Sequence, residues 1–221
     1  MFPIRRNFEP VEPEWLERFA SIPAPLAADG NAGAGVLAGL RPLDPESRLV
    51  GPALTVHAQP GDNLIVYRAL EEARPGDILV VRTGAHRECA LIGDIVAAFL
   101  QRTGVAGLVT DGLVRDEDGI RELGFPAFCA GVHPAGPGKQ GGYGIGYPVV
   151  VGGALVRAGD LIVGDRDGVV ALRRSALAEV WARIEAKEAS EAEARSALAA
   201  GERLSAGARE RLATRPYEVR G

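Results

Sequence analysis

The chain has 221 residues, of which 47% are hydrophobic, and its 25 basic and 29 acidic side chains give a net charge of −4. The basic residues are scattered rather than clustered, which argues against nucleic acid as a partner, because binding to phosphates requires a basic surface. No apolar run approaches the ~18 residues that span a bilayer, and the N-terminus lacks the apolar segment of a signal peptide, so we expect a soluble, cytoplasmic protein with no membrane partner.

Residues 1–44 are predicted to form an N-terminal arm followed by a helical and loop segment. The beginning of the arm is rich in proline and charge, and a short helix is expected to start behind Pro13. The glycine-rich stretch 26–43 predicts only a weak helix end and a loop, because glycine destabilises helix interiors.

Residues 45–174 are predicted to form the core domain, which begins with alternating strands and helices. Apolar runs typical of strands alternate there with stretches of helical spacing, the first of which has Asp62 as its expected N-cap. Because strands joined by helices pair in parallel, this half predicts a parallel sheet. The expected strands are 49–58, 76–83, 105–112 and 125–132, and the expected helices are 62–73, 93–104 and 116–124.

The second half of the core has no helical pattern. A turn-rich loop covers residues 133–148, and three short antiparallel strands joined by Gly and Asp turns are expected in residues 149–174. Residues 175–221 predict a long helix with Ser175 as its N-cap, ending near Leu198, and then a polar tail. The overall prediction is a mixed α/β sandwich, with parallel strands first and antiparallel strands after them.

Two strand ends carry candidate chemistry, and the first is the junction LIGDIVAA. Gly93 and Asp94 lie where a helix is expected to begin, and free backbone N–H groups at a helix start attract a carboxylate or a phosphate. The alternative is that Asp94 simply caps its own helix.

The second junction, VTDGLVRD, presents Arg115 and Asp116 at the end of the next strand. The 20 residues between Asp94 and Arg115 are enough for one helix, one turn and one strand, a path that returns the chain to the same edge of the sheet. A lone carboxylate can hold Mg²⁺, an adjacent guanidinium can hold a carboxylate or carbonyl oxygen, and a second carboxylate can act through water as acid or base. Together these groups suit stabilisation of an enolate. The alternative is a surface ion pair worth ~0–1 kcal/mol.

The order of these segments, with Asp94, Arg115 and Asp116 in a D-x20-R-D motif, resembles the family of class II pyruvate aldolases that act on 4-hydroxy-4-methyl-2-oxoglutarate and 4-carboxy-4-hydroxy-2-oxoadipate. That family also contains RraA-type regulators of ribonuclease E. The resemblance covers residues 45–172 well and the two ends loosely. It implies a β/β/α sandwich of the swivelling phosphohistidine-domain type, assembled as a homotrimer or homohexamer with sites between subunits.

The resemblance also implies a role for each residue of the motif. Asp116 would bind a divalent metal ion, Mg²⁺ or alternatively Mn²⁺, that also chelates the pyruvyl group of the substrate. Arg115 would hold the keto oxygen and stabilise the enolate, and the backbone amides after Gly93 and Asp94, at Ile95 and Val96, would bind the substrate carboxylate. Asp94 would position the water that moves the proton.

The chain departs from the family pattern near its ends. The family usually supplies an acidic residue to the neighbouring subunit's site from an N-terminal Ser-Asp-Ala helix, whereas this chain offers Asp29 in a glycine-rich context. Glu188 and Glu191 of the C-terminal helix are further candidates to reach across an interface. For all three residues the alternative is simple exposure to solvent.

Three weaker signals have plainer explanations. The stretch GGYGIG resembles a nucleotide loop but does not open a helix, so a turn is expected. Lys139 lies in a Gly/Pro loop with no apolar run to lower its pKa, which argues against a Schiff base and leaves a rim or solvated lysine. His86 and Arg87 follow a strand end, where they either line the cleft or face solvent.

The sequence therefore predicts a metal-dependent aldolase that cleaves a 4-hydroxy-2-oxo acid to pyruvate and a second keto acid. Oxaloacetate decarboxylation is expected as a side activity, because it passes through the same enolate. The alternative function is that of an RraA-like regulator, which binds and inhibits a ribonuclease or a helicase without turnover.

Overall fold

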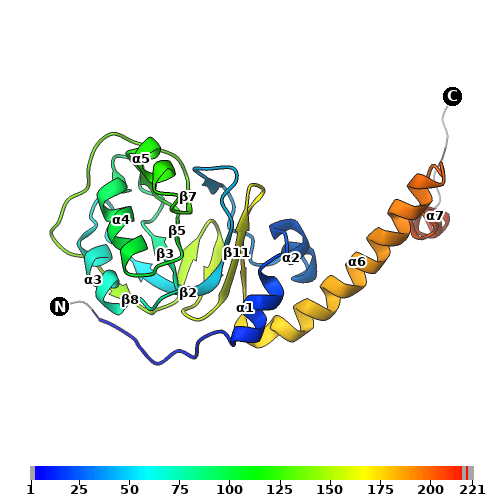
Figure 1. The fold of residues 1–221 in the computed structure, drawn as a ribbon, viewed down its shortest axis with the longest axis horizontal. Helices are drawn as coiled ribbons and strands as arrows, with labels where there is room; N and C mark the ends of the chain where they lie inside the picture. The colour runs from blue at the N-terminus through cyan, green and yellow to red at the C-terminus, as the bar shows by residue number, and fades with distance from the viewer. Residues whose placement is uncertain (1–2, 216–217, 219–221) are drawn as a thin grey trace.

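The computed structural model describes residues 3–215 and residue 218, and these form a mixed α/β fold (Figure 1). Its main sheet has eight strands in the order β1-β7-β5-β3-β2-β11-β12, with β8 paired to β2. The strands of this sheet are β1 Arg41–Pro42, β2 Leu49–His57, β3 Ile78–Arg82, β5 Gly107–Thr110, β7 Ala127–Cys129, β8 Gly144–Ile145, β11 Leu161–Asp165 and β12 Gly168–Leu172. Two small sheets pair β4 Ala90–Ile92 with β6 Leu113–Val114, and β9 Val149–Val151 with β10 Ala154–Val156.

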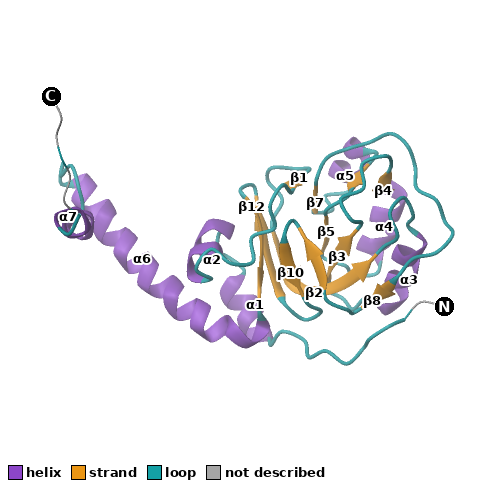
Figure 2. Ribbon diagram, turned by 180° about the vertical axis from the view of Figure 1, so that it is seen from behind, coloured by secondary structure: helices purple, strands orange, loops and turns teal. Residues whose placement is uncertain are grey.

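The parallel half of the main sheet confirms the expected alternation. Strands β2, β3, β5 and β7 pair in parallel, and β3 and β5 are almost wholly buried apolar runs, as sheets covered on both faces require. Three helices lie together on one side of this sheet (Figure 2). They are α3 Leu64–Glu72, α4 Asp94–Arg102 and α5 Glu117–Glu122, and their apolar faces share one core cluster with the sheet.

The antiparallel half has four strands where three were expected. Gly152 and Gly153 both have positive φ, at 54° and 80°, and form the two-residue turn that divides the apolar run into β9 and β10. Strand β11 pairs antiparallel with both β2 and β12. The Arg41 guanidinium on edge strand β1 donates to the Asp167 carbonyl beside β12 (2.8 Å), so the two edges of the sheet approach one another and nearly close a barrel.

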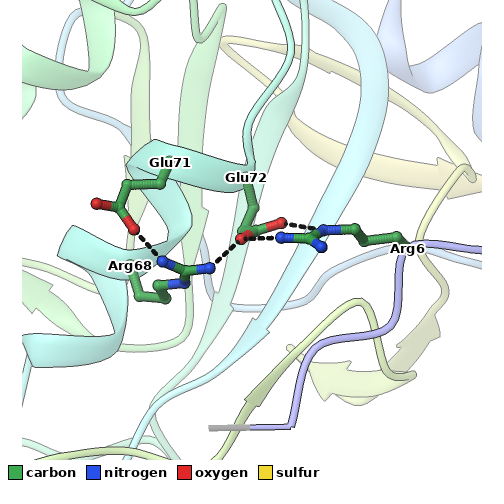
Figure 3. Close-up of polar contacts among 4 residues, drawn as sticks. All are labelled: Arg6, Arg68, Glu71 and Glu72. Carbon is green, nitrogen blue, oxygen red and sulfur yellow. Dashed lines mark hydrogen bonds and ion pairs between the residues drawn. The ribbon is translucent and has the colours of Figure 1, made fainter.

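The N-terminal arm packs along the core domain and contacts both β8 and α3. Ile4 bridges to Ile145 of β8, and the Arg6 guanidinium donates two hydrogen bonds, of 2.6 and 2.7 Å, to the Glu72 carboxylate at the end of α3. Arg68 binds the same carboxylate at 2.6 Å and also contacts Glu71 (Figure 3). The Glu72 side chain is only 7% exposed, and two arginines from different parts of the chain balance its charge.

The remaining helices lie at the far side of the main sheet from α3, α4 and α5 (Figures 1 and 2). They are α1 Pro13–Phe19, α2 Ala24–Gly30, α6 Leu177–Ala199 and α7 Ala206–Ala213. The first turns of α6 bury Leu177, Val180 and Ile184 against α2, whereas the rest of α6 extends away from the body of the molecule (Figure 1). Close contact with Ile184 and Val180 requires a glycine at position 30.

Several boundaries differ from those expected. Ser175 does not cap α6, because a 3-10 turn at Arg174–Ala176 precedes the helix and places Ala176 at its N-cap. Residues 206–213 form a helix in place of a polar tail, with Ser205 as a true N-cap. Asn63 rather than Asp62 is the N-cap residue of α3, although the Asp62 carboxylate accepts from the Leu64 amide (2.8 Å).

No helix in residues 3–215 is long and apolar enough to cross a membrane.

Candidate functional site

The two junctions of the D-x20-R-D motif are held together by the small parallel sheet of β4 and β6. Strand β4 ends at Ile92, directly before Gly93 and Asp94, and β6 ends at Val114, directly before Arg115. The Arg115 amide donates to the Ile92 carbonyl at 2.9 Å and extends this pairing by one residue. The expectation that both junctions lie at one edge is thus met, but on a separate two-stranded sheet rather than on the main one.

Gly93 permits the close approach of these two junctions. A Cβ atom at this position would lie 2.2 Å from Asp116 Oδ2 and 3.1 Å from Arg115 Nε. The backbone of Gly93 is extended, with φ −123° and ψ −169°, so glycine is needed for space rather than for conformation. The side chains of Arg115 and Asp116 therefore occupy the volume directly over the start of α4.

Asp116 has a left-handed backbone, with φ 55° and ψ 47°, at the N-cap of α5. Such a conformation is uncommon for a residue other than glycine, and Asp tolerates it better than most. It directs the carboxylate toward Arg115, whose Nε lies 3.3 Å from Asp116 Oδ2. This pair is close but poorly aligned, and Arg115 Nε is a buried donor without a hydrogen-bond partner in the described structure. Glu117 and Asp118 lie in the first turn of α5, as expected.

Asp94 occupies the first position of α4, and its Oδ1 accepts from the Ile95 amide at 2.7 Å. The Ile95 amide, expected to bind a substrate carboxylate, is therefore already engaged by Asp94. The Val96 amide also lies in the first turn of the helix, where N–H groups have no acceptor within the helix. Gly119 of α5 packs against Asp94 so closely that a Cβ atom would lie 2.9 Å from the Asp94 Cβ.

Asn63 belongs to the site but was not anticipated from the sequence. It is 2% exposed, its Nδ2 donates to the Leu91 carbonyl at 2.9 Å, and its Oδ1 is a buried acceptor with no partner in the described structure. The loop of residues 133–148 folds over Asn63, because the backbone N–H of Asn63 donates to the Gly138 carbonyl (3.1 Å). Buried polar atoms are rarely left unpaired, so Asn63 Oδ1 and Arg115 Nε together mark a place for a polar ligand or water.

Lys139 lies on the rim of the same site. Its ammonium group is 3.1 Å from the Tyr67 hydroxyl and 4.8 Å from the centre of the Tyr67 ring. This contact favours a rim lysine over a freely solvated one. The loop that carries Lys139 also packs closely against Arg115, because a Cβ atom on Gly136 would lie 2.8 Å from Arg115 Nη1.

These side chains surround a pocket of about 370 Å³ at the N-terminus of α4. Two carboxylates and two cations line it, which leaves the protein groups close to electrically neutral. The pocket is lined by Asn63, Tyr67, Ile92, Gly93, Asp94, Ile95, Val96, Arg115, Asp116, Gly136, Pro137 and Lys139. All the motif residues and the neighbouring backbone predicted for substrate binding thus share one cavity.

The three candidates for an interfacial role lie elsewhere in this chain. Asp29 on α2 pairs with Lys187 of α6 at 2.9 Å and raises the pKa of that lysine, chiefly by accepting its hydrogen bond. Glu191 pairs with Arg195 at 2.7 Å, and Glu188 is exposed on α6. Helices α2 and α6 lie across the main sheet from α4 (Figure 2), so a role for these acids at the pocket would require a neighbouring subunit. Neither His86 nor Arg87 lines this pocket.

The donor set suits a hard cation that retains much of its water. Within residues 3–215 and 218, no group of three or more His, Cys, Asp or Glu side chains is arranged to hold a metal ion. Asp116 instead presents one half-exposed carboxylate to an open, polar cavity. Mg²⁺ typically uses one or two carboxylates plus water and substrate oxygens, so the residues present fit it.

Comparison with known proteins identifies the family. A family model described as RraA-like, Aldolase/RraA, matches residues 27–171. The chain belongs to the RraA-like family. Among its relatives in this family is a Halalkalibacterium halodurans protein that is provisionally named a 4-hydroxy-4-methyl-2-oxoglutarate aldolase. The two are 36% identical over 182 residues, which cover 82% of this chain and 87% of the relative.

Solved structures with the same fold include one protein named as a member of the RraA family. An uncharacterized protein from Pseudomonas syringae aligns with a TM-score of 0.77 and 27% identity, covering 88% of this chain and 96% of the other. RraAS2 of Streptomyces coelicolor, described as an unusual member of the RNase ES inhibitor RraA family, aligns with a TM-score of 0.73 and 29% identity, covering 83% and 95%. The family thus includes proteins named for enzymatic activity and proteins named for inhibition of an RNase.

Proposed function

We propose that this chain is a class II, divalent-metal-dependent aldolase. Its substrate would be a 4-hydroxy-2-oxo acid of the 4-hydroxy-4-methyl-2-oxoglutarate or 4-carboxy-4-hydroxy-2-oxoadipate type, cleaved to pyruvate and a second keto acid. The observation that carries the proposal is the meeting of Asp94, Arg115 and Asp116 in one polar pocket at a helix N-terminus. The names of its curated relatives support the same activity.

Asp116 is the residue that would hold the metal ion, with Mg²⁺ first and Mn²⁺ second in preference. When bound, the ion supplies a Lewis acid that draws electrons from the 2-keto group. The left-handed backbone of Asp116 and the absent side chain at Gly93 leave room for this carboxylate in the pocket lining, where it is 44% exposed and would bind the ion together with water and substrate oxygens.

The other residues bind the substrate and move its proton. The Val96 amide would receive the pyruvyl carboxylate at the positive end of α4, and Arg115 would donate to the keto oxygen. Asp94, through a water, would accept the proton of the 4-hydroxyl group. Lys139, which contacts Tyr67 at the rim, would meet the second carboxylate of the substrate, and Asn63 Oδ1 would accept a hydrogen bond from a hydroxyl group or a water.

The chemical step follows from these placements. Loss of the hydroxyl proton forms the new keto group, the bond between the third and fourth carbons breaks, and its electron pair passes to the pyruvate enolate. Arg115 stabilises the developing oxyanion by a charge-assisted hydrogen bond, and such donors are worth about 10²–10³ in rate. Protonation of the enolate then releases pyruvate. Oxaloacetate decarboxylation forms the same enolate and is proposed as a side activity.

A coupled assay for pyruvate release tests the proposal. A panel of 4-hydroxy-2-oxo acids would be supplied to the full chain with Mg²⁺, with Mn²⁺ and with EDTA. We expect turnover that EDTA abolishes and Mg²⁺ restores, and a loss of about 10²–10³ in kcat for Arg115→Ala. Turnover that persists in EDTA, or full activity of Arg115→Ala, would contradict the mechanism.

A second candidate function is that of an RraA-like regulator, which the similarity to RraAS2 favours. Such a protein would bind a ribonuclease or a helicase through its acidic surface without turnover. Tight, salt-sensitive binding to such a partner, together with no pyruvate release from any keto acid, would favour this candidate over the aldolase.

Three further features belong to the proposal. The sandwich is proposed to be of the swivelling phosphohistidine-domain type, the assembly a homotrimer or homohexamer, and the location the cytoplasm. In such an assembly Asp29, Glu188 or Glu191 would reach a neighbour's pocket from the far side of the sheet. Light scattering coupled to gel filtration measures the assembly directly.

A further inference from the structure

A second pocket, separate from the one at α4, lies at the carboxyl ends of β3, β5 and β7. Its volume is about 380 Å³. Arg82 is the last residue of β3, Asp111 follows β5, and Ala130 follows β7, so three neighbouring parallel strands point into it. This edge of a parallel sheet is where ligands of α/β proteins usually bind. The aldolase proposal makes no use of this pocket.

The cations of this second pocket are not paired with carboxylates. Neither Arg82 nor Arg87 forms an ion pair with a carboxylate within residues 3–215 and 218. The basic residues that do so there are Arg6, Arg18, Arg68, Arg115, Arg121, Arg174, Arg183, Lys187, Arg195 and Arg209. The Arg82 guanidinium contacts the His57 ring instead. Burial, and then the charge of Arg82, lower the pKa of His57, whereas the nearby charge of Asp111 opposes this shift. An imidazole ring carries no negative charge in either form, so this contact does not neutralise Arg82.

Arg87 is oriented by backbone carbonyls alone. Its Nη1 donates to the Asp111 carbonyl at 2.7 Å and to the His86 carbonyl at 3.1 Å. These bonds fix the direction of the guanidinium at the pocket wall without supplying a negative charge.

Asp111, the one carboxylate that lines the pocket, already accepts three hydrogen bonds from its own protein. Its Oδ1 accepts from the Thr83 amide (2.6 Å) and hydroxyl (2.9 Å), and its Oδ2 accepts from the Ala85 amide (3.0 Å). These bonds hold Gly84 and Ala85 in left-handed conformations, with φ of 71° and 56°. The loop between the two arginines is therefore built on Asp111, which is only 8% exposed.

The glycines that line the second pocket offer little steric hindrance to a ligand. Among them are Gly39, Gly152 and Gly153. A Cβ atom on Gly39 or Gly153 would meet nothing within 4 Å, so the backbone there borders open space. A ligand can thus approach the backbone closely at Gly39 and Gly153, in a pocket that two arginines also line.

We propose that this second pocket binds a small, doubly charged oxyanion between Arg82 and Arg87. A guanidinium group recognises a phosphate or a carboxylate through paired N–H donors, and two guanidinium groups match two negative charges. Inorganic phosphate and organic dicarboxylates share this chemistry, and the two are separated by the choice of probe.

Isothermal titration of the full chain with inorganic phosphate and with malonate, at constant ionic strength set by chloride, tests the proposal. We expect saturable binding of at least one anion, weakened about tenfold or more in Arg82→Gln and in Arg87→Gln, since hydrogen bonds to charged groups carry that much affinity. Phosphate alone would identify a tetrahedral anion, whereas binding of both would identify a general dianion site. Arg102→Gln, an exposed arginine in the last turn of α4, is the matched control and should leave the affinity unchanged.

Two outcomes would overturn the proposal. One is that neither anion binds in a saturable manner. This includes the case in which a second copy of the chain fills the pocket, which would be recognised because Arg87→Gln would then dissociate an oligomer. The other is equal affinity in the wild type and in Arg87→Gln. Arg87 is exposed, so this variant is expected to fold, and a thermal melting curve checks that it does.

Discussion

Replacement of Gly93 by alanine should lower the proposed aldolase activity about 100-fold while leaving the fold intact. The added Cβ atom would lie 2.2 Å from Asp116 Oδ2, and ordinary contact begins at 3.4 Å, so the carboxylate must move by at least 1.2 Å. Displacements of about 1 Å in a catalytic arrangement cost on the order of 100-fold in rate, or about 2.7 kcal/mol. The extended backbone of Gly93 accepts alanine, and Asp116 is 44% exposed and free to swing outward, so stability should change little.

The assay is pyruvate release by Gly93→Ala, combined with titration of Mn²⁺ into the same variant. Both the rate and the metal affinity should fall, because the displaced group is the proposed metal ligand. Gly207→Ala is the control, since a Cβ atom there meets only Arg211 Nη1 at 3.9 Å within a helix. If Gly93→Ala kept both its activity and its metal affinity, the close approach would have no functional meaning, and if it unfolded, the site would not be separable from the core.

Three further predictions concern stability, measured by urea unfolding. The hydrogen bond with Arg6 is the largest of the effects that lower the pKa of Glu72 below its ordinary value of 4.5. The contribution of Glu72 to the free energy of unfolding is therefore complete above pH 4.5 and is lost as the pH falls through the lower pKa of the folded state. Glu72→Gln should reduce the dependence of the free energy of unfolding on pH in this acid range. Gly30→Ala should cost about 1–3 kcal/mol, because its Cβ atom would lie 2.6 Å from Ile184 Cγ1. Asn63→Ala should cost about 1–3 kcal/mol by leaving the buried Leu91 carbonyl unpaired. An unchanged slope or midpoint would contradict each argument.

The parallel half of the fold could be predicted because its strands are apolar runs separated by helical spacing. The D-x20-R-D residues could also be placed in one cavity from the length of chain between them. The small sheet of β4 and β6 that supports this cavity could not be predicted, because both strands are too short to show the alternation typical of a strand and they form a sheet of their own. The division of residues 149–156 into two strands depended on how the chain turns at Gly152 and Gly153.

Asn63 shows why part of the site escaped prediction. In the sequence it follows Gly61 and Asp62 and precedes a helical pattern, which is typical of a helix cap. Its place in the pocket depends on the loop 133–148, far along the chain, which closes over it through the Gly138 carbonyl. Lys139 reaches the rim through the same loop. Contacts between such distant segments leave no local periodicity to read.

Under the proposed function, the hydrogen bond from the Ile95 amide to the Asp94 carboxylate would make the Asp94 side chain a competitor of the substrate. If the pyruvyl carboxylate, which is proposed to bind the Val96 amide, also took the Ile95 amide, it would displace the Asp94 side chain. The Asp94 carboxylate would then be free to face the bound molecule. Binding and activation of the base would then be one exchange rather than two events. A ligand without a carboxylate at that end would leave Asp94 latched to its own helix, so the α4 N-terminus would select substrates by releasing the catalytic group only for those that can replace it.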